Sequence, residues 1–274
     1  MTLPSIAIIG TGAMGGAILS GLLAPSVTVA GGIRVTNRTE AKARALDGPG
    51  VVSYALESVP RGNLEAVDGA AIVLLGVKPA LLPDTLAELA PALDPNALVI
   101  SVAAGVTTAT MEALVPNPVL RAMPNTPAIV GKAVTGLAAG SRATPEQVAL
   151  GRALFETVGS VVEVPESQID ALSTISGSGP AYVFYLIEEL TRTAVGLGFA
   201  PDVAAQLVSG TFEGAVALLA ASGRSPEELR AQVTSPKGTT ERAIAVMQEA
   251  DLAGMFDRAT AAALARAREL AAGA

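Results

Sequence analysis

Short, continuously apolar segments alternate with amphipathic segments along the first half of the chain. Apolar runs of about 4–8 residues are typical of strands that are covered on both faces of a sheet. The pattern predicts strands at Ser5–Gly10, Ile33–Thr36, Ile72–Gly76, Leu98–Val102 and Val119–Met123, with further strands at Thr135–Ala139 and Val161–Val164.

Amphipathic helices are expected between these strands, at Ala13–Leu23, Thr39–Leu46, Leu81–Leu89, Thr107–Leu114 and Pro145–Val158. Alternating strands and helices predict a doubly wound, mostly parallel sheet of the Rossmann type. After about Pro165 the strands stop, and consecutive helices are expected at Gln168–Ser176, Ala181–Gly196, Pro201–Ala221, Pro226–Val233, Thr239–Ala250 and Leu252–Ala271.

The change of pattern predicts two domains, an α/β domain over residues 1–164 and an all-helical domain over residues 165–274. The helical half is rich in alanine and has few large side chains. Small residues let helices approach closely, so this half is a candidate surface for self-association. An ordinary helical subdomain would have the same texture.

Composition limits the chemistry that is available to the chain. The net charge of −7 argues against nucleic acid as a partner, because phosphate binding needs a basic face. Without cysteine or histidine, the chain lacks thiol nucleophiles and the commonest acid–base group, and we expect no metal site. No uncharged apolar run of about 18 residues and no secretory signal is evident, so we expect a cytoplasmic protein without a membrane span.

A glycine motif, Gly10-Thr-Gly12-Ala-Met-Gly15, follows the first strand and opens the first helix. In this context the first glycine permits a tight turn, the second admits a pyrophosphate, and the third lets helix and strand pack closely. The backbone of Ala13 and Met14 then lies at a helix N-terminus, which attracts anions. The motif predicts that the α/β domain binds a dinucleotide.

The end of the second strand indicates which dinucleotide is bound. An NAD enzyme usually has a carboxylate there for the ribose hydroxyls, whereas this chain has Asn37 and Arg38. A guanidinium pairs well with a 2′-phosphate, so we expect NADPH, with NADH as a weaker cofactor. The alternative is that Arg38 is a solvated loop charge.

Loops at the carboxyl ends of the later strands are expected to complete the cofactor site, because ligands of open α/β sheets bind at that edge. Lys78 could face phosphate or ribose, and the small residues of the other loop could lie against the cofactor. The candidates are Val77, Lys78, Pro79, Ala103 and Ala104.

Three further segments narrow the assignment: Arg121-Ala-Met-Pro-Asn-Thr-Pro127, Ser176-Gly-Ser-Gly-Pro-Ala-Tyr-Val-Phe184 and Val233-Thr-Ser-Pro-Lys-Gly-Thr-Thr240. In this order, after the glycine motif and Val77-Lys78-Pro79, they resemble the pyrroline-5-carboxylate reductases over essentially the whole chain. The resemblance implies a Rossmann domain followed by a helical dimerisation domain. It also implies reduction of 1-pyrroline-5-carboxylate to L-proline, in dimers or rings of dimers.

The resemblance also implies roles for individual residues. The substrate loop of the family matches Ser235 to Thr240, where the backbone at Gly238, Thr239 and Thr240 would hold the substrate carboxylate. The Thr240 hydroxyl would reach the imine nitrogen as the catalytic group, Glu166 would lie near the same ring nitrogen, and Asn63 would line the adenosine pocket. Taken alone, the two threonines could be helix caps and Glu166 a surface acid at a helix start.

The chain departs from the family pattern in the substrate loop. Lys237 stands where the usual Ser-Pro-Gly-Gly has its first glycine, and Gln232 replaces an asparagine of some relatives. If the loop needs a positive φ at this position, Lys237 is strained, although a cation beside a carboxylate site could also strengthen binding.

Three other functions remain open from the sequence. They are a reductase of a related cyclic imine, a β-hydroxyacid dehydrogenase, and an NADP sensor or scaffold without turnover. The dehydrogenases rely on a catalytic lysine in the helical half, and after Lys132 this chain has only Lys237. The substitution at Lys237 is the feature that favours a sensor.

Overall fold

The computed structural model describes residues 1–271, and these form two compact units. Met1–Ser178 make up the first unit together with residues 263–271. Gly179–Ala262 make up the second.

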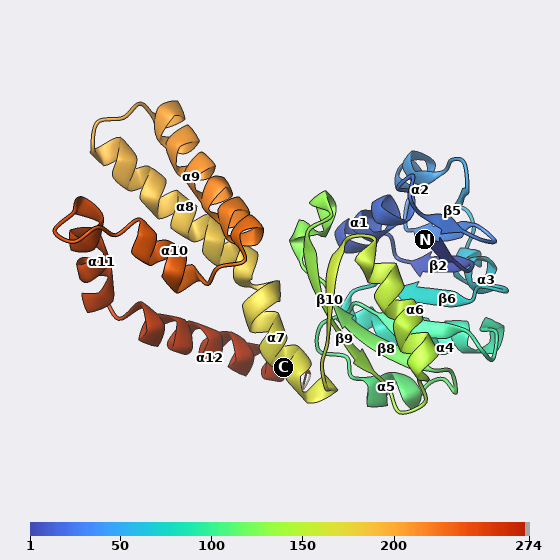
Figure 1. The fold of residues 1–274 in the computed structure, drawn as a ribbon. Helices are drawn as coiled ribbons and strands as arrows, with labels where there is room; N and C mark the ends of the chain where they lie inside the picture. The colour runs from blue at the N-terminus through green and yellow to red at the C-terminus, as the bar shows by residue number, and fades with distance from the viewer. Residues whose placement is uncertain (272–274) are drawn as a thin grey trace. The chain divides into compact units, whose positions relative to one another are not determined.

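An eight-stranded sheet forms the centre of the first unit (Figure 1). Its strand order is β10-β9-β8-β7-β6-β2-β4-β5, and every pair is parallel except β8 with β9. The strands are β2 (Ile6–Ile9), β4 (Ile33–Asn37), β5 (Val51–Ala55), β6 (Ile72–Leu75), β7 (Leu98–Ser101), β8 (Val119–Met123), β9 (Ala133–Ala139) and β10 (Gly159–Glu163). The expected doubly wound sheet is confirmed, and its strand order reverses between β2 and β6.

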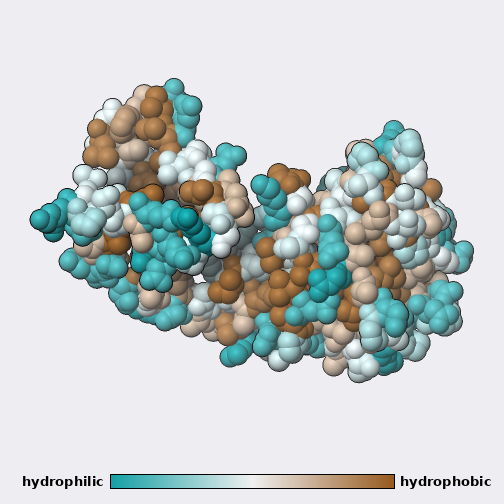
Figure 2. Space-filling view, in the orientation of Figure 1, coloured by the Kyte–Doolittle hydropathy of each residue, from teal (hydrophilic) through white to brown (hydrophobic). Residues whose placement is uncertain are grey.

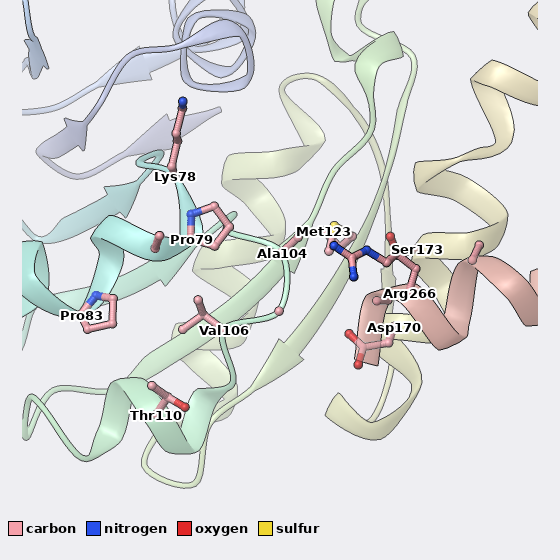
Figure 3. Close-up of a pocket in the computed structure, with 14 residues that line it drawn as sticks. Lys78, Pro79, Pro83, Ala104, Val106, Thr110, Met123, Asp170, Ser173 and Arg266 are labelled. Carbon is pink, nitrogen blue, oxygen red and sulfur yellow. The ribbon is translucent and has the colours of Figure 1, made fainter. Parts of the chain in front are cut away.

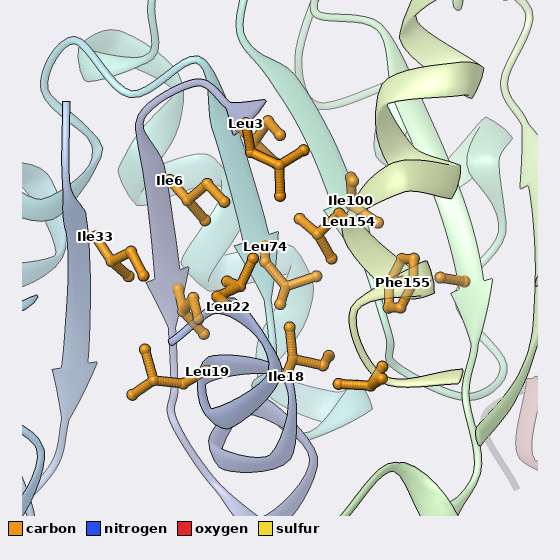
Figure 4. Close-up of a cluster of buried hydrophobic side chains, with 14 of the residues drawn as sticks. Leu3, Ile6, Ile18, Leu19, Leu22, Ile33, Leu74, Ile100, Leu154 and Phe155 are labelled. Carbon is orange, nitrogen blue, oxygen red and sulfur yellow. The ribbon is translucent and has the colours of Figure 1, made fainter. Parts of the chain in front are cut away.

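Helices cover both faces of this sheet because buried side chains project from both faces of its central strands. On one face, Ile18 and Leu22 of α1 and Leu154 and Phe155 of α6 pack in a cluster with Leu74 and other strand residues (Figure 4). On the other face, α3, α4 and α5 bury a second cluster. The helices of this unit are α1 (Ala13–Leu22), α2 (Glu40–Leu46), α3 (Gly62–Val67), α4 (Leu82–Leu89), α5 (Thr108–Glu112), α6 (Pro145–Glu156) and α7 (Ile169–Leu172).

Some short elements were not predicted from the sequence. They are β5, α3 and a small parallel pair, β1 (Thr2–Leu3) and β3 (Thr28–Val29). Strand β5 lies at an edge of the sheet, where Val52 is exposed and Val51 and Ala55 are buried. An edge strand has fewer buried positions than the continuous apolar runs from which the other strands were predicted.

The segment after β10 packs on the sheet rather than with the later helices. Ile169 is fully buried against Met123 and Ala138, and Asp170 pairs with Arg121. The packing boundary therefore falls at 178/179, whereas the change of sequence pattern placed it at 164/165. The helix expected at Gln168–Ser176 is divided into a 3₁₀ turn at Glu166–Gln168, α7, and a π-helical turn at Ser173–Gly177.

The second unit is helical, as expected from its sequence. It holds α8 (Gly179–Gly196), α9 (Pro201–Ser222), α10 (Pro226–Gln232), α11 (Thr239–Glu249) and the first half of α12 (Leu252–Ala271). Gly223 ends α9 in a left-handed conformation, and Ser225 with Glu228 forms a reciprocal cap on α10.

Large apolar side chains lie on the surface of this unit (Figure 2). They include Phe184, Tyr185, Leu197, Val216 and Val246. Among the described residues, α9 is the helix that is long and apolar enough to cross a membrane by length and composition alone. This differs from the expectation of no such segment. An apolar helix that packs against another protein passes the same test, so the finding does not by itself indicate a membrane.

Candidate active site

The loop between β2 and α1 has the geometry that the glycine motif predicts. Gly10 has φ +82°, and a Cβ there would lie 3.0 Å from a methyl group of Val77. A Cβ on Gly15 would lie 3.1 Å from the Gly10 carbonyl oxygen, whereas a Cβ on Gly12 would meet no atom within 4 Å. The first and third glycines are therefore needed for packing, and the second borders open space in which a pyrophosphate can be held.

Thr36 at the end of β4 holds this loop in place. Its hydroxyl accepts a hydrogen bond from the Gly10 N–H at 3.1 Å, and its carbonyl accepts from the N–H and the hydroxyl of Thr11. Thr11 and Thr36 are both buried. This pair could not be predicted, because its members lie far apart in sequence and β4 also carries the polar residues Arg34 and Asn37.

The start of α1 provides an anion-binding surface at the point where the strand order reverses. Gly12 is the N-cap and contributes no side-chain cap, so within the described chain the first-turn amides of Ala13 and Met14 have no hydrogen-bond partner. Free amides and the helix dipole both favour a phosphate at this position.

Two buried amides next to this loop lack partners within the described chain. The Nδ2 atom of Asn37 and the Oδ1 atom of Asn63 are unpaired, although both side chains are more than nine-tenths buried. Asn63 Nδ2 makes one long contact of 3.4 Å with Glu88. Unpaired buried polar atoms are costly, and polar groups of a nucleoside could satisfy both. These residues therefore fit a dinucleotide.

Arg38 follows Asn37 and is exposed. Its guanidinium takes part in none of the ion pairs that the described residues form, and the nearby Glu40 pairs with Arg44 instead. A free guanidinium at the end of the second strand is available to an anionic ligand.

The loops after β6 and β7 border a cavity of about 930 Å³ (Figure 3). Lys78, Pro79 and Ala104 come from these loops, and Met123 comes from the end of β8. All lining residues belong to the first unit, including Asp170 of α7 and Arg266 near the end of α12. The expected loop residues Val77 and Ala103 are half-buried and buried, whereas Lys78, Pro79 and Ala104 are exposed.

A buried arginine organises the segment beside this cavity. Arg121 of β8 is 2% exposed, and its guanidinium lies 2.6 Å from Asp170 and 3.7 Å from Glu166. Both carboxylate oxygens of Glu166 also accept hydrogen bonds from Thr108, at the first turn of α5. The carboxylate expected near the substrate is thus already engaged in contacts that join the 3₁₀ turn before α7 to α5 and β8.

Asn125, in the loop after β8, joins the π-helical turn at Ser173–Gly177 to β9. Its Nδ2 donates to the carbonyl of Ser176 at 2.9 Å, and its Oδ1 accepts from the N–H of Val134. Arg121 and Asn125 both belong to Arg121–Pro127, one of the three segments that carry the family resemblance.

The expected substrate loop, Ser235–Thr240, lies in the second unit at the start of α11. Gly238 is the N-cap and has no side chain to cap the helix. Within the described chain, no hydrogen bond is made by the amides of Thr239 and Thr240 or by the two hydroxyls. The start of this helix therefore has free donors, as a carboxylate site requires.

Lys237 adopts the positive φ that the sequence analysis considered, with a value of 60°. Its N–H donates to Glu241 Oε2 at 2.9 Å. In this left-handed backbone conformation, a residue with a side chain costs about 1 kcal/mol of folding free energy relative to glycine. The condition under which strain was expected at Lys237, a positive φ, is therefore met.

Among the described residues, no group of three or more acidic side chains is arranged to hold a metal ion. The cofactor residues expected from the sequence all lie in the first unit. The substrate residues lie in the second, except for Glu166.

Comparisons with known proteins match a family profile to each of two parts of the chain. The family profile described as pyrroline-5-carboxylate reductase dimerisation matches residues 166–270, and a profile described as coenzyme F420-dependent NADP oxidoreductase matches residues 5–105. The pyrroline-5-carboxylate reductase of Corynebacterium melassecola is 41% identical over 97% of this chain and 98% of its own length. The chain belongs to the pyrroline-5-carboxylate reductase family.

Other members of the pyrroline-5-carboxylate reductase family show the same similarity over their whole length. The Pseudomonas aeruginosa enzyme is 38% identical over 99% of this chain and 98% of its own length. A solved pyrroline-5-carboxylate reductase from Coxiella burnetii has a TM-score of 0.89 and 36% identity, with 97% of each chain covered. The expected family and fold are thereby confirmed.

Proposed function

We propose that this chain reduces 1-pyrroline-5-carboxylate to L-proline with NADPH, and more slowly with NADH. Membership of the family, together with the geometry of the glycine loop, carries the proposal. The open space at Gly12 and the unpaired atoms of Asn37 and Asn63 fit a dinucleotide. When bound, the reduced nicotinamide supplies the hydride that the reaction requires.

The preference for NADPH rests on Arg38. This guanidinium is exposed and free of carboxylate partners among the described residues, at the strand end where NAD enzymes usually have an acidic residue. Gly10, Gly12, Ala13, Met14 and Gly15 would hold the pyrophosphate. Val77, Lys78, Pro79, Ala103 and Ala104 would lie along the remainder of the cofactor.

The substrate is assigned to the start of α11. The amides of Thr239 and Thr240 would hold its carboxylate, with Ser235 and Gly238 shaping the loop, and the Thr240 hydroxyl would hydrogen-bond the ring nitrogen as its charge changes. A protonated imine accepts hydride without a strong acid from the protein, which suits a chain without histidine. Glu166 would lie near the same ring nitrogen, as a positioning residue held by Thr108 and Arg121.

The exposed apolar side chains of α8 and α9 support a homo-oligomer, either a dimer or a ring of dimers, and the proposed location is the cytoplasm. Copies of this chain and the small-molecule substrate are then its partners.

The decisive experiment mixes purified protein with NADPH and pyrroline-5-carboxylate and follows the loss of NADPH absorbance, with NADH in parallel. We expect rapid loss with proline as the product and a higher kcat/KM with NADPH. Tight NADPH binding with no turnover would instead support an NADP sensor, the alternative that the substitution at Lys237 favours. Turnover confined to another cyclic imine would keep the reaction class and change the substrate.

A further inference from the structure

Lys237 has a positive φ, and its side chain forms no ion pair with a described residue that would offset the cost of this conformation. Among the described residues, only Lys237 and Asp251 combine a side chain with a positive φ. The Lys237 side chain is exposed, and its ammonium takes part in no ion pair of the described chain. Its backbone N–H is bonded to Glu241, a bond that glycine would make equally well. Folding alone therefore favours glycine at this position.

The position brings a positive charge to the proposed substrate loop. Lys237 directly precedes Gly238, the N-cap of α11, and lies two residues before Thr239. Glu241, the acidic residue in the first turn of α11, accepts the Lys237 N–H and leaves the ammonium without a partner. A lysine has a flexible four-carbon side chain with three donors, so its ammonium can follow an anion that binds at this helix start.

We infer that Lys237 is a specificity-determining residue, whose ammonium pairs with the carboxylate of the substrate at the start of α11. The inference rests on the proposed function, and it assigns to the side chain a task separate from that of the loop backbone. The amides orient the carboxylate, and the ammonium adds a charge-assisted contact that increases affinity. The charge acts on substrate binding and not on the reacting nitrogen, so its removal should change KM rather than kcat.

Three substitutions separate the charge from the strain. Lys237→Gln removes the charge and keeps a side chain at positive φ, Lys237→Gly removes both, and Lys237→Arg keeps both. Arg242→Gln is the matched control, because it removes one positive charge from an exposed position within α11, the helix that Lys237 precedes.

Steady-state kinetics at low and high salt provide the test. At low salt, Lys237→Gln and Lys237→Gly should both raise the KM for pyrroline-5-carboxylate by about three- to tenfold, as expected for one exposed charge-assisted contact. Their kcat and their KM for NADPH should stay within about twofold, and the KM difference should shrink at high salt because ions screen the charge. Lys237→Arg and Arg242→Gln should behave as the wild type. An unchanged KM in Lys237→Gln at low salt would overturn the inference.

A second measurement separates this inference from the proposed function. Calorimetric titration of L-proline into the full chain with NADP⁺ measures carboxylate binding without turnover. If the wild type does not turn over pyrroline-5-carboxylate but binds proline, and Lys237→Gln weakens that binding, the proposed function fails and the role of Lys237 stands. If proline binds both proteins equally, or binds neither, the role of Lys237 is wrong.

Discussion

Gly76 at the end of β6 lies against Gly10 so closely that a Cβ on Gly76 would be 2.5 Å from the Gly10 carbonyl oxygen. The obstruction is backbone and cannot move aside like a flexible side chain. We expect Gly76→Ala to displace the loop between β2 and α1 and to weaken NADPH binding by at least about tenfold, since a shift of about 1 Å in a positioning loop can cost a hundredfold. Fluorescence titration with NADPH measures the change.

Gly16→Ala is the matched control for this prediction. Gly16 lies in α1, and a Cβ there would meet no atom within 4 Å outside the local helix backbone. The same substitution should leave NADPH affinity unchanged and raise stability by about 0.5–1 kcal/mol, because alanine is favoured over glycine within helices. Equal NADPH affinities for the two variants would show that the contact between Gly76 and Gly10 does not hold the loop.

Arg38→Ala should raise the KM for NADPH by about tenfold or more and leave the KM for NADH within about twofold. The expected loss corresponds to one charge-assisted contact with a 2′-phosphate that NADH lacks. Parallel kinetics with the two cofactors measure the ratio directly. Lys42→Ala, in the neighbouring helix α2, controls for the loss of a nearby positive charge. An unchanged preference for NADPH in the Arg38 variant would contradict the assignment.

Thr240→Ala should lower kcat by about tenfold to several hundredfold, because one hydrogen bond to the nitrogen is lost in the transition state. NADPH affinity should change little. Thr240→Ser retains the hydroxyl and should restore most of the turnover, which distinguishes a chemical role from one of packing or capping. Wild-type turnover in the alanine variant would remove Thr240 from the reaction.

Glu112 gives a prediction of pH dependence. Burial raises the pKa of this carboxyl, but hydrogen bonds from Ser141 and from the backbone of Arg142, with the Arg142 charge, outweigh that effect and lower the pKa below its usual value. Its stabilising contribution is therefore present above the unfolded pKa and is lost as the pH falls through the folded one. Glu112→Gln should lower the melting temperature at pH 7, and the difference should shrink as the pH falls through the folded pKa. A difference that persists in acid would contradict this explanation.

Much of the fold could be predicted because the central strands are buried along their whole length, and a buried strand appears in the sequence as a continuous apolar run. Strand β8 was predicted with its observed bounds, Val119–Met123, since each residue is buried and the run is almost wholly apolar. Helix α12 was likewise predicted at Leu252–Ala271. Strand β5 was missed because only part of an edge strand is buried, and periodicity then carries little signal.

The residues that position the site were harder to predict because their partners are distant in sequence. Thr36 binds Gly10 across 26 residues, and Asn125 binds Ser176 across 51. No local pattern encodes such pairs. By contrast, Gly10 was recognisable from the glycine motif, and Lys237 from its departure from the Ser-Pro-Gly-Gly pattern of the family that the chain resembles. Both occupy a positive φ.

Arg121 and Asp170 form an ion pair whose environment determines its contribution to stability. The Arg121 side chain is 3% exposed, and its pairing with Asp170 at 2.6 Å fixes the segment that leads out of the sheet. Arg121→Met would leave Asp170 and Glu166 without their cation. We expect the free energy of unfolding to fall by about 1–3 kcal/mol, since both carboxylates lose their cation but are partly exposed, at 28% for Asp170 and 26% for Glu166.

Arg44→Met is the matched control for this pair. Arg44 lies 2.8 Å from Glu40, but its side chain is 81% exposed. Because exposed pairs contribute little, this variant should lose less than about 0.5 kcal/mol. Urea denaturation followed by circular dichroism, at one protein concentration so that self-association is constant, measures both. Equal losses would mean that burial does not set the contribution of the Arg121 pair, and that the segment from Glu166 to Ser173 is held chiefly by Ile169 in its apolar cluster.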